Sequence, residues 1–338
     1  MKITLKRDID ESLKNDWIYL EKNNSFFIFQ TLLWNLSWLK ENHKQDDILI
    51  VTVHDKENPV IIFPFCVVKK FNFKILKWIG HDISDYLGPL INKKYKLESI
   101  LFTDIWDSII KLIKKECDYI FLDKQTNENF FSNNPIVKYL NCKKYDETYG
   151  INLTKWDELK KYKNKSLQKF RWSKKKLLEI GNLEFVKKIE SDDEKKVSIK
   201  KIIDWKKNKK NNLNFSKSFS DKFYLNFIND NNITISGLKL NKNFIALSLG
   251  YEKNENYLYL VPSYKGDDDL IRFSPGKILM IELIDYFESQ KFKYFDFCDG
   301  KETYKENWTN NKVDLFKYTK STNFFGIVLN FLLKIKKI

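Results

Sequence analysis

The chain has 338 residues, of which 43% are hydrophobic and 16% aromatic, and its formal net charge is +15. This length exceeds the usual ~100–150 residues of one domain, so two core-forming units are expected, and the apolar content excludes a disordered chain. The charge comes from lysines spread over the whole chain with only three arginines. We interpret it as a compositional bias that attracts anionic ligands and lipids, and nucleic acid is an unlikely partner.

The cysteines and the apolar runs of the sequence indicate the cellular compartment of the protein. Cys66, Cys117, Cys142 and Cys298 stand alone, without a CxxC motif or a nearby histidine, so we expect reduced core residues and no metal site. The first residues lack the apolar segment of a signal peptide, and no run approaches the ~20 apolar residues of a membrane span. These features predict a cytoplasmic protein.

The first 150 residues predict an α/β unit. Helices are expected over residues 9–22, 31–44 and 97–115. Strands are expected over residues 48–53, 60–68, 75–79, 119–122 and 149–153, the first two joined as a hairpin. The loop at residues 80–88 contains His81, Asp82, Asp85 and Tyr86. These residues fit either an acceptor-binding cleft or a structural loop.

Residues 151–323 predict a second unit with a similar order of elements. Helices are expected over residues 156–180, from about 192, over 276–289 and across Tyr304. Strands are expected over residues 183–189, 233–240, 244–251, 257–261, 294–297 and 313–318. We expect the strand 257–261 to end at Pro262, because proline lacks a backbone donor. The repeated order predicts a tandem α/β fold with mixed sheets flanked by helices.

A basic run over residues 160–176 holds nine lysines and arginines and no acid. Interleaved aromatic residues also fit a nucleic-acid surface. We favour an amphipathic helix that turns Leu159, Tyr162, Leu167, Phe170 and Leu177 inward and its lysines to solvent.

Ser274-Pro275-Gly276 predicts a helix start, with serine as N-cap, proline at the first position and glycine leaving the first turn bare. Free N–H groups and the helix dipole at such an end attract phosphate. Arg272 lies two residues earlier, and its planar fork suits a phosphate partner. An ordinary capped helix beside an exposed arginine explains the same residues, so both interpretations stay open at this point.

The C-terminal half resembles a known family. The run from Ser274-Pro275-Gly276 to Asp296-Phe297-Cys298-Asp299-Gly300-Lys301-Glu302-Thr303-Tyr304-Lys305 is similar to the signature of the CelD/BcsL-type acetyltransferases of the GNAT superfamily, which are relatives of the FemAB aminoacyltransferases. Phe29-Gln30…Trp34, Phe63-Pro64-Phe65 and Gly80…Asp85-Tyr86 also look like that family. The resemblance implies two GNAT-like domains, a degenerate one over residues 1–150 on the acceptor side and one over 151–323 with the acyl-CoA site.

The resemblance further implies an acyl-CoA-dependent N- or O-acyltransferase with acetyl-CoA or another acyl-CoA as co-substrate and no permanently bound cofactor. Its acceptor would be an amine or hydroxyl of a cell-surface glycan or polysaccharide precursor. The expected donor-binding residues are Leu260, Val261, Arg272, Ser274, Gly276, Lys277 and Ile278. The catalytic candidates are Asp299, Glu302 and Tyr304, with Tyr304 as the acid that protonates the thiolate. Plain packing explains Tyr304 equally well, and the second unit contains no histidine to serve as base.

Two other functions stay open. One is a FemAB-like transferase that uses aminoacyl-tRNA, and the other is a non-catalytic GNAT-fold scaffold. A separate segment over residues 324–338 is apolar and carries Lys334, Lys336 and Lys337 near its end. It either docks on the body of the protein or lies on the anionic inner face of a membrane.

Overall fold

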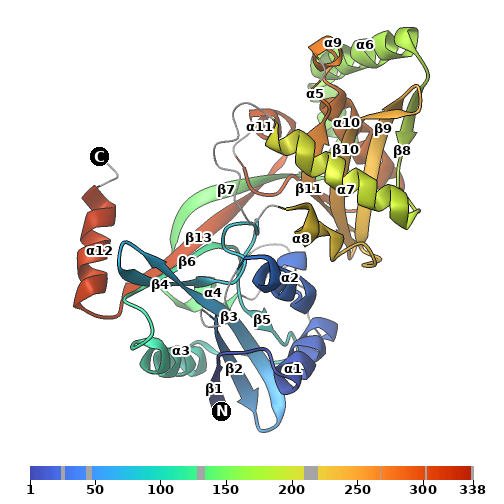
Figure 1. Ribbon diagram of the computed structural model, residues 1–338. Helices are drawn as coiled ribbons and strands as arrows, with labels where there is room; N and C mark the ends of the chain where they lie inside the picture. Colours follow the sequence, from blue (N-terminus) through green and yellow to red (C-terminus); the bar gives the residue numbers. More distant parts are fainter. Residues whose placement is uncertain are drawn as a thin grey trace. The chain divides into compact units, whose positions relative to one another are not determined.

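The computed structural model describes residues 1–23, 27–42, 48–127, 134–208, 220–266, 268–300 and 303–335. The chain divides into two compact units. Unit 1 consists of Met1–Glu147 and Val313–Ile338, and unit 2 consists of Thr148–Lys312. Each unit is a mixed α/β structure in which helices flank a mixed sheet (Figure 1). The expected fold class is therefore confirmed.

The sheet of unit 1 has the strand order β1-β2-β3-β4-β6-β13, with β5 on β3. Its neighbours run antiparallel except for β4 and β6, which are parallel. The strands are β1 (Lys2–Lys6), β2 (Ile48–Asp55), β3 (Asn58–Lys70), β4 (Phe73–Trp78), β5 (Leu90–Ile91), β6 (Tyr119–Gln125) and β13 (Asn311–Ser321). The helices are α1 (Glu11–Lys22), α2 (Leu32–Asn42), α3 (Ser99–Ile113), α4 (Pro135–Tyr139) and α12 (Phe324–Ile335).

Helices pack on both faces of this sheet. On one face, Phe102 and Ile109 of α3 share a core with Leu76 of β4 and Ile120 of β6. The neighbouring residues Ile75 and Tyr119 instead pack with Leu329 of α12. Because side chains alternate across a strand, α3 and α12 lie on opposite faces of the sheet.

The sheet of unit 2 has the strand order β7-β12-β11-β10-β9-β8, with β11 and β12 parallel and the other described pairs antiparallel. The strands are β7 (Lys143–Asn152), which enters from unit 1, β8 (Leu183–Val186), β9 (Ile233–Leu240), β10 (Asn243–Lys253), β11 (Asn256–Tyr264) and β12 (Tyr294–Asp296). The helices are α5 (Trp156–Tyr162), α6 (Asn164–Ile180), α7 (Asp192–Lys207), α8 (Asp221–Leu225), α9 (Asp268–Ile271), α10 (Pro275–Ser289) and α11 (Thr303–Trp308).

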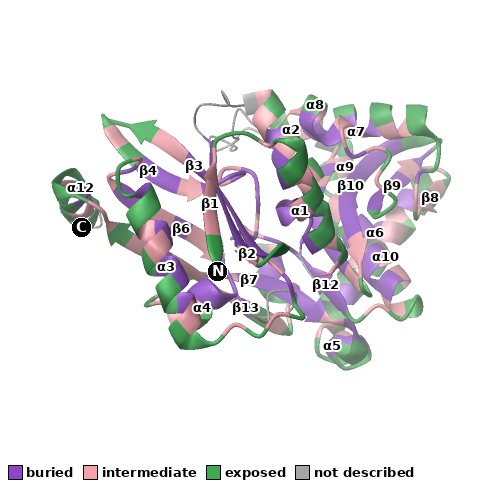
Figure 2. Ribbon diagram, turned by 90° about the horizontal axis from the view of Figure 1, so that it is seen from below, coloured by how far each residue is buried: buried purple, intermediate pink, exposed green. Residues whose placement is uncertain are grey.

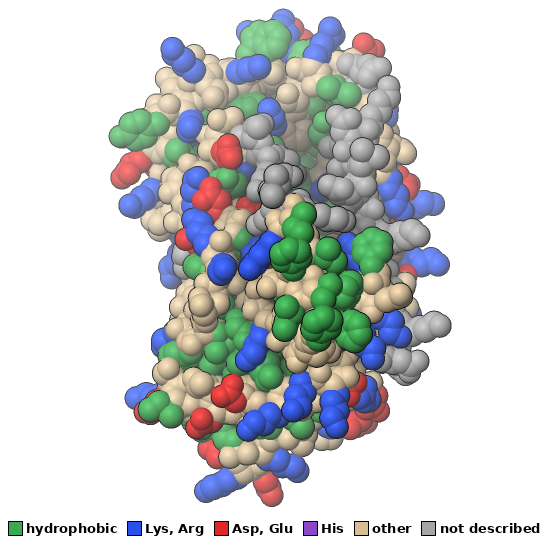
Figure 3. Space-filling model, turned by 90° about the vertical axis from the view of Figure 1, so that its left-hand side faces the viewer, with side chains coloured by type: hydrophobic (Ala, Val, Ile, Leu, Met, Phe, Trp, Pro, Cys, Tyr) green, Lys and Arg blue, Asp and Glu red, His purple; other side chains and the backbone are tan. Residues whose placement is uncertain are grey.

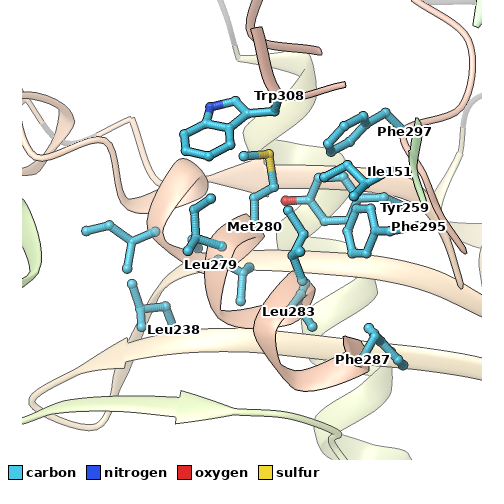
Figure 4. Packing of buried hydrophobic residues seen from close by; sticks show 14 of the residues in the cluster. Ile151, Leu238, Tyr259, Leu279, Met280, Leu283, Phe287, Phe295, Phe297 and Trp308 are labelled. Atoms are coloured by element: carbon cyan, nitrogen blue, oxygen red, sulfur yellow. The ribbon is translucent and has the colours of Figure 1, made fainter. Parts of the chain in front are cut away.

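The core of unit 2 forms around α10, most of whose apolar side chains are buried. Leu279, Leu283 and Phe287 of this helix lie against the aromatic side chains of β11 and β12 (Figure 4). The rings of Phe287 and Tyr257 stack with centroids 4.0 Å apart. Figure 2 shows the same pattern for the sheets, whose strands are largely buried while the outer sides of the helices are exposed.

The division into units differs from the expected one. Residues 313–323 were assigned to the second domain and 324–338 to a separate tail, but both belong to unit 1. The reason is strand pairing, because β13 lies beside β6 and places Phe316 opposite Gln125. In addition, the Trp106 indole N–H donates to the Tyr318 hydroxyl at 3.2 Å.

The basic run also differs in part from the expectation. It forms two helices, α5 and α6, that meet at Lys163, where the backbone leaves the helical range. Leu159, Leu167 and Leu177 are buried as expected for an amphipathic helix. Tyr162, however, is 86% exposed, because the break before α6 changes the phase of the apolar face.

Candidate active site

The two parallel strands of unit 2 are paired only over the first part of β11. Their pairing covers Asn256–Tyr294 to Leu258–Asp296, where β12 ends, whereas β11 continues to Tyr264. Between Leu258 and Val261, β11 has one residue more than the segment of β10 that lies opposite. This extra residue is a β-bulge after Leu258. Past the bulge, the side of β11 that faced β12 has no strand beside it among the described residues.

The expected end of this strand at Pro262 is therefore wrong. Pro262 lies opposite Ser248 of β10, and the strand runs two residues further. Proline is tolerated where the missing donor would face an unpaired edge, and the opening beside β12 provides such an edge.

A cavity of about 460 Å³ lies at this opening. Its walls come from the end of β11, the start of α10, the short helix α11 and one lysine of α7. Tyr259 and Met280 form part of its floor and lie beside one another in the core (Figure 4). The residues that line the cavity include Lys206, Tyr259, Ser263, Tyr264, Ser274, Gly276, Lys277 and Tyr304.

The start of α10 has the expected residues in an unexpected conformation. Ser274 is the N-cap and Pro275 the first helical residue, but Ser274 is left-handed (φ 54°, ψ 54°) and its side chain makes no capping hydrogen bond. The N–H groups of Lys277 and Ile278 both donate to the Ser274 carbonyl, at 2.9 and 3.2 Å. Of the three expected donors Gly276, Lys277 and Ile278, only Gly276 has an N–H without a hydrogen bond to the described residues. One donor is therefore available rather than three.

Gly276 makes a close contact possible at the first turn of α10. A Cβ at this position would lie 2.9 Å from Cδ1 of Tyr264, closer than carbon atoms normally approach. The absence of a side chain thus allows the Tyr264 ring to cover the first turn of the helix. The ring and the N–H group of Gly276 together shape one wall of the cavity.

The positive charges at the cavity are lysines. Lys206 and Lys277 line it. Arg272 does not: it is exposed, and its guanidinium carbon lies 4.8 Å from the ring centre of Phe273. The structure thus places Arg272 outside the lining of this cavity, and its role as a charge partner stays a prediction. Two ammonium groups and the positive end of α10 favour an anionic ligand here.

Hydroxyl groups occupy the inner wall. Tyr304 lies on α11 and packs edge-on against Phe297, with ring centroids 6.2 Å apart. Tyr259 is 2% exposed, and burial raises the pKa of its phenol, so this hydroxyl keeps its proton. The Ser263 hydroxyl is buried and has no hydrogen-bond partner in the described part of the chain. Such a group is costly to bury unless a ligand satisfies it.

Of the other expected site residues, none of those that the structure describes lines the cavity. The Asp299 carboxylate accepts from the Gly300 N–H at 2.7 Å, and the buried Lys305 ammonium donates to the Asp299 carbonyl at 2.5 Å. Asp299 does not line the cavity, and Glu302 lies outside the described residues. Leu260 and Val261 lie on β11 at and after the bulge, and Ile278 is buried in α10.

The sequence interpretation missed Lys206, Ser263 and Tyr264. Lys206 belongs to one of many lysine-rich stretches, so no local signal separates it from the others. Ser263 and Tyr264 follow Pro262, which the sequence predicts as the end of the strand. A strand interpretation that continued past this proline would have found both.

Comparison with known proteins found one family model that matches part of unit 2. Residues 164–306 match the family model described as "Acetyltransferase (GNAT) domain". The match covers less than half of the chain, and this part is similar to a GNAT acetyltransferase domain. No curated protein matches the sequence.

Solved structures resemble the whole chain. FemX has a TM-score of 0.60 at 13% identity, over 98% of this chain and 99% of its own. The C-terminal domain of a putative lysylphosphatidylglycerol synthetase from Agrobacterium fabrum has a TM-score of 0.54 at 10% identity, over 94% of each chain. L-PGS from Bacillus licheniformis has 0.53 at 12% identity, over 96% of each chain. At these identities the likeness concerns the fold alone.

Two searches of the described residues bear on other kinds of site. No cluster of three or more histidine, cysteine, aspartate or glutamate side chains is arranged there to hold a metal ion. Nor is any helix in the described ranges both long enough and apolar enough to cross a membrane.

Proposed function

We propose that this protein is an acyl-CoA-dependent N- or O-acyltransferase and that the donor binds in the cavity of unit 2. The observation that carries the proposal is the cavity itself, at the point where β11 leaves β12. It combines the free N–H of Gly276, the ammonium groups of Lys206 and Lys277, and the hydroxyl of Tyr304.

Each part of an acyl-CoA would have a chemically suitable part of the cavity beside it. Its pyrophosphate would accept from Gly276 N–H and lie between Lys206 and Lys277. Its pantetheine arm carries amides and would follow the unpaired edge of β11 in the manner of an added strand. Pockets of ~300–1,000 Å³ hold drug-sized ligands, so about 460 Å³ suits the arm and thioester while the adenosine extends to solvent.

The transfer step would take place at the thioester. The acceptor amine or hydroxyl attacks the carbonyl carbon, a new bond to nitrogen or oxygen forms, and the carbon–sulfur bond breaks. Backbone N–H groups near Leu260 and Val261 would stabilise the developing oxyanion. Tyr304 would give its proton to the departing thiolate, and Asp299 or Glu302 is the candidate base for the acceptor proton.

The acceptor is proposed on the resemblance to CelD/BcsL-type enzymes. It would be an amine or hydroxyl of a cell-surface glycan or polysaccharide precursor. Contact of residues 324–338 with an anionic membrane is likewise a proposal.

A FemAB-like transferase that takes its acyl group from aminoacyl-tRNA is the second candidate. The likeness to FemX extends over nearly the whole length of both chains, and it favours this second candidate. A scaffold without catalysis would bind neither donor.

Calorimetric titration with acetyl-CoA and with aminoacyl-tRNA separates these candidates. Wild type should bind acetyl-CoA, and Lys206→Ala or Lys277→Ala should weaken binding by roughly 10–150-fold, the equivalent of one charged hydrogen bond of ~1.5–3 kcal/mol. Arg272→Ala is the matched control, because Arg272 lies outside the cavity, and it should stay within about twofold.

Each contrary result has a distinct meaning. Binding of aminoacyl-tRNA without acetyl-CoA would replace the proposal by the FemAB-like function. A folded protein that binds neither donor would be a scaffold. An equal loss in Arg272→Ala would move the phosphate site away from the cavity.

A further inference from the structure

Helix α12 packs against the sheet of unit 1 with one side only. Its residues Gly326 and Leu329 are buried, and a Cβ at Gly326 would overlap the Asp118 carbonyl, so the glycine lets the helix approach the start of β6. The Asn323 side-chain amide donates to Asp118 at 2.8 Å. The orientation of the helix is therefore defined by specific contacts.

The other side of α12 is apolar and uncovered. Phe324, Phe325, Ile327 and Phe331 are 60–72% exposed. Figure 3 shows hydrophobic side chains gathered on this face of the molecule with lysines and arginines around them. Contiguous exposed apolar patches of this kind mark interaction sites.

A groove beside the helix extends this apolar surface. It has a volume of about 660 Å³ and lies between α12 and the outer face of β3, β4 and β6. Its walls are mostly apolar, and two lysines, Lys70 and Lys77, contribute to its lining. The apolar walls include Phe73, Phe121, Leu329, Leu332 and Leu333.

The hairpin between β3 and β4 adds an aromatic residue where folding does not require one. Phe71 and Asn72 form its two-residue turn, both with positive φ, 49° and 63°. Asparagine and glycine are the residues that suit this turn, and an aromatic residue there is strained. Phe71 is nevertheless 78% exposed, and the Lys70 ammonium lies 5.9 Å from the centre of its ring.

The charges of this region indicate what it contacts. Lys70 and Lys77 lie at the groove, and Lys334 lies in the last turn of α12. Asp118, the acid at the base of the helix, is held by Asn323 and by the backbone N–H of Lys74. Two copies of such a basic face would repel each other, whereas anionic lipid headgroups would complement it.

We propose that α12, the groove and the tip of the β3–β4 hairpin form one membrane-binding face that inserts into an anionic lipid leaflet. A helix of 12 residues is about 18 Å long and cannot cross a hydrocarbon core of about 30 Å, so α12 lies in the interface. Phe71 enters the leaflet beside the helix, and the lysines contact the headgroups. The face belongs to unit 1 and does not depend on the proposed acyl-CoA site.

Co-sedimentation of the full chain with vesicles tests this face. Wild type should bind vesicles of phosphatidylcholine and phosphatidylglycerol at low salt, bind phosphatidylcholine alone weakly, and dissociate as salt rises. Phe71→Asn should lower the partition coefficient by about tenfold, because one buried aromatic side chain is lost from the leaflet. Since asparagine suits the turn, this variant should melt at or above the wild-type temperature.

Ile100→Asn provides the matched control. Ile100 is 79% exposed on α3, in the same unit but on the opposite face of the sheet, and its substitution should leave lipid binding unchanged. Charge reversal by Lys70→Glu with Lys77→Glu should lower binding by more than tenfold.

Three results would overturn the inference. The first is a folded wild type that does not bind anionic vesicles. The second is an equal loss of binding in Ile100→Asn. The third is a dimer in solution that Phe71→Asn dissociates without any effect on vesicles, which would make the face a contact between copies.

Discussion

The contact between Gly276 and Tyr264 gives the sharpest test of the candidate site. Alanine at position 276 would place a methyl group 2.9 Å from the Tyr264 ring, whereas carbon atoms at rest are about 3.5–4.0 Å apart. The ring must therefore move by roughly 0.6–1 Å. Because Tyr264 lines the cavity, this movement changes the wall against which the donor would lie.

The magnitude follows from two opposing terms. Overpacking of this kind costs about 1–3 kcal/mol, and the better helix propensity of alanine returns up to about 1 kcal/mol. The free energy of unfolding should thus fall by ~0–3 kcal/mol, which corresponds to at most several degrees in melting temperature. Affinity for acetyl-CoA should fall by at least ~10-fold, because the displaced ring and the added methyl group both narrow the approach to the Gly276 N–H.

Thermal unfolding and calorimetric titration of Gly276→Ala measure these two effects. Gly266→Ala is the control, since a Cβ at Gly266 meets no atom within 4 Å, and it should behave as wild type. A Gly276→Ala protein that melts at or above wild type and binds acetyl-CoA equally well would refute the reasoning about this wall.

Two further predictions concern catalysis and pH. Tyr304→Phe keeps the ring against Phe297, so kcat should fall by ~10²–10⁴ with little change in donor KM, and a steady-state assay showing less than a threefold change would assign Tyr304 to packing. Burial, with a smaller effect of the Asp118 carboxylate, raises the pKa of Cys117 from 9.0 to about 12. The thiol therefore stays protonated in the folded protein, and iodoacetamide labelling at pH 8 should be at least ~10-fold slower than in the unfolded chain. The pKa of Cys117 is higher in the folded than in the unfolded protein, so the contribution of the protonated thiol to the free energy of unfolding is complete below about pH 9. This contribution is lost between about pH 9 and 12, and urea unfolding across that range can measure the loss.

Local patterns predicted most of the elements, because their physics is local. The alternation of Ile245, Leu247 and Leu249 with small residues predicts a strand, and β10 covers them. Ser274 and Pro275 predicted the start of α10 to the residue. In both places the deciding contacts lie within a few positions along the chain.

The missed features depend on contacts between distant segments. Lys206 reaches the cavity because α7 packs beside β11, and no nearby residue signals this. Arg272 stood out by its rarity, but its position over Phe273 depends on the turn formed by Ser274. The membership of β13 in unit 1 depends on pairing with β6, which is almost 200 residues away in sequence.

That pairing has a consequence for synthesis of the protein. Chains emerge N-terminus first, so all of unit 2 is made before β13 reaches β6. Until then, β6 is an unpaired edge and Trp106 lacks its contact with Tyr318, a state that invites association with other chains. Unit 2 has its whole sequence at that moment and can fold first. A nonsense mutation near codon 313 would thus damage the half of the protein that was translated first.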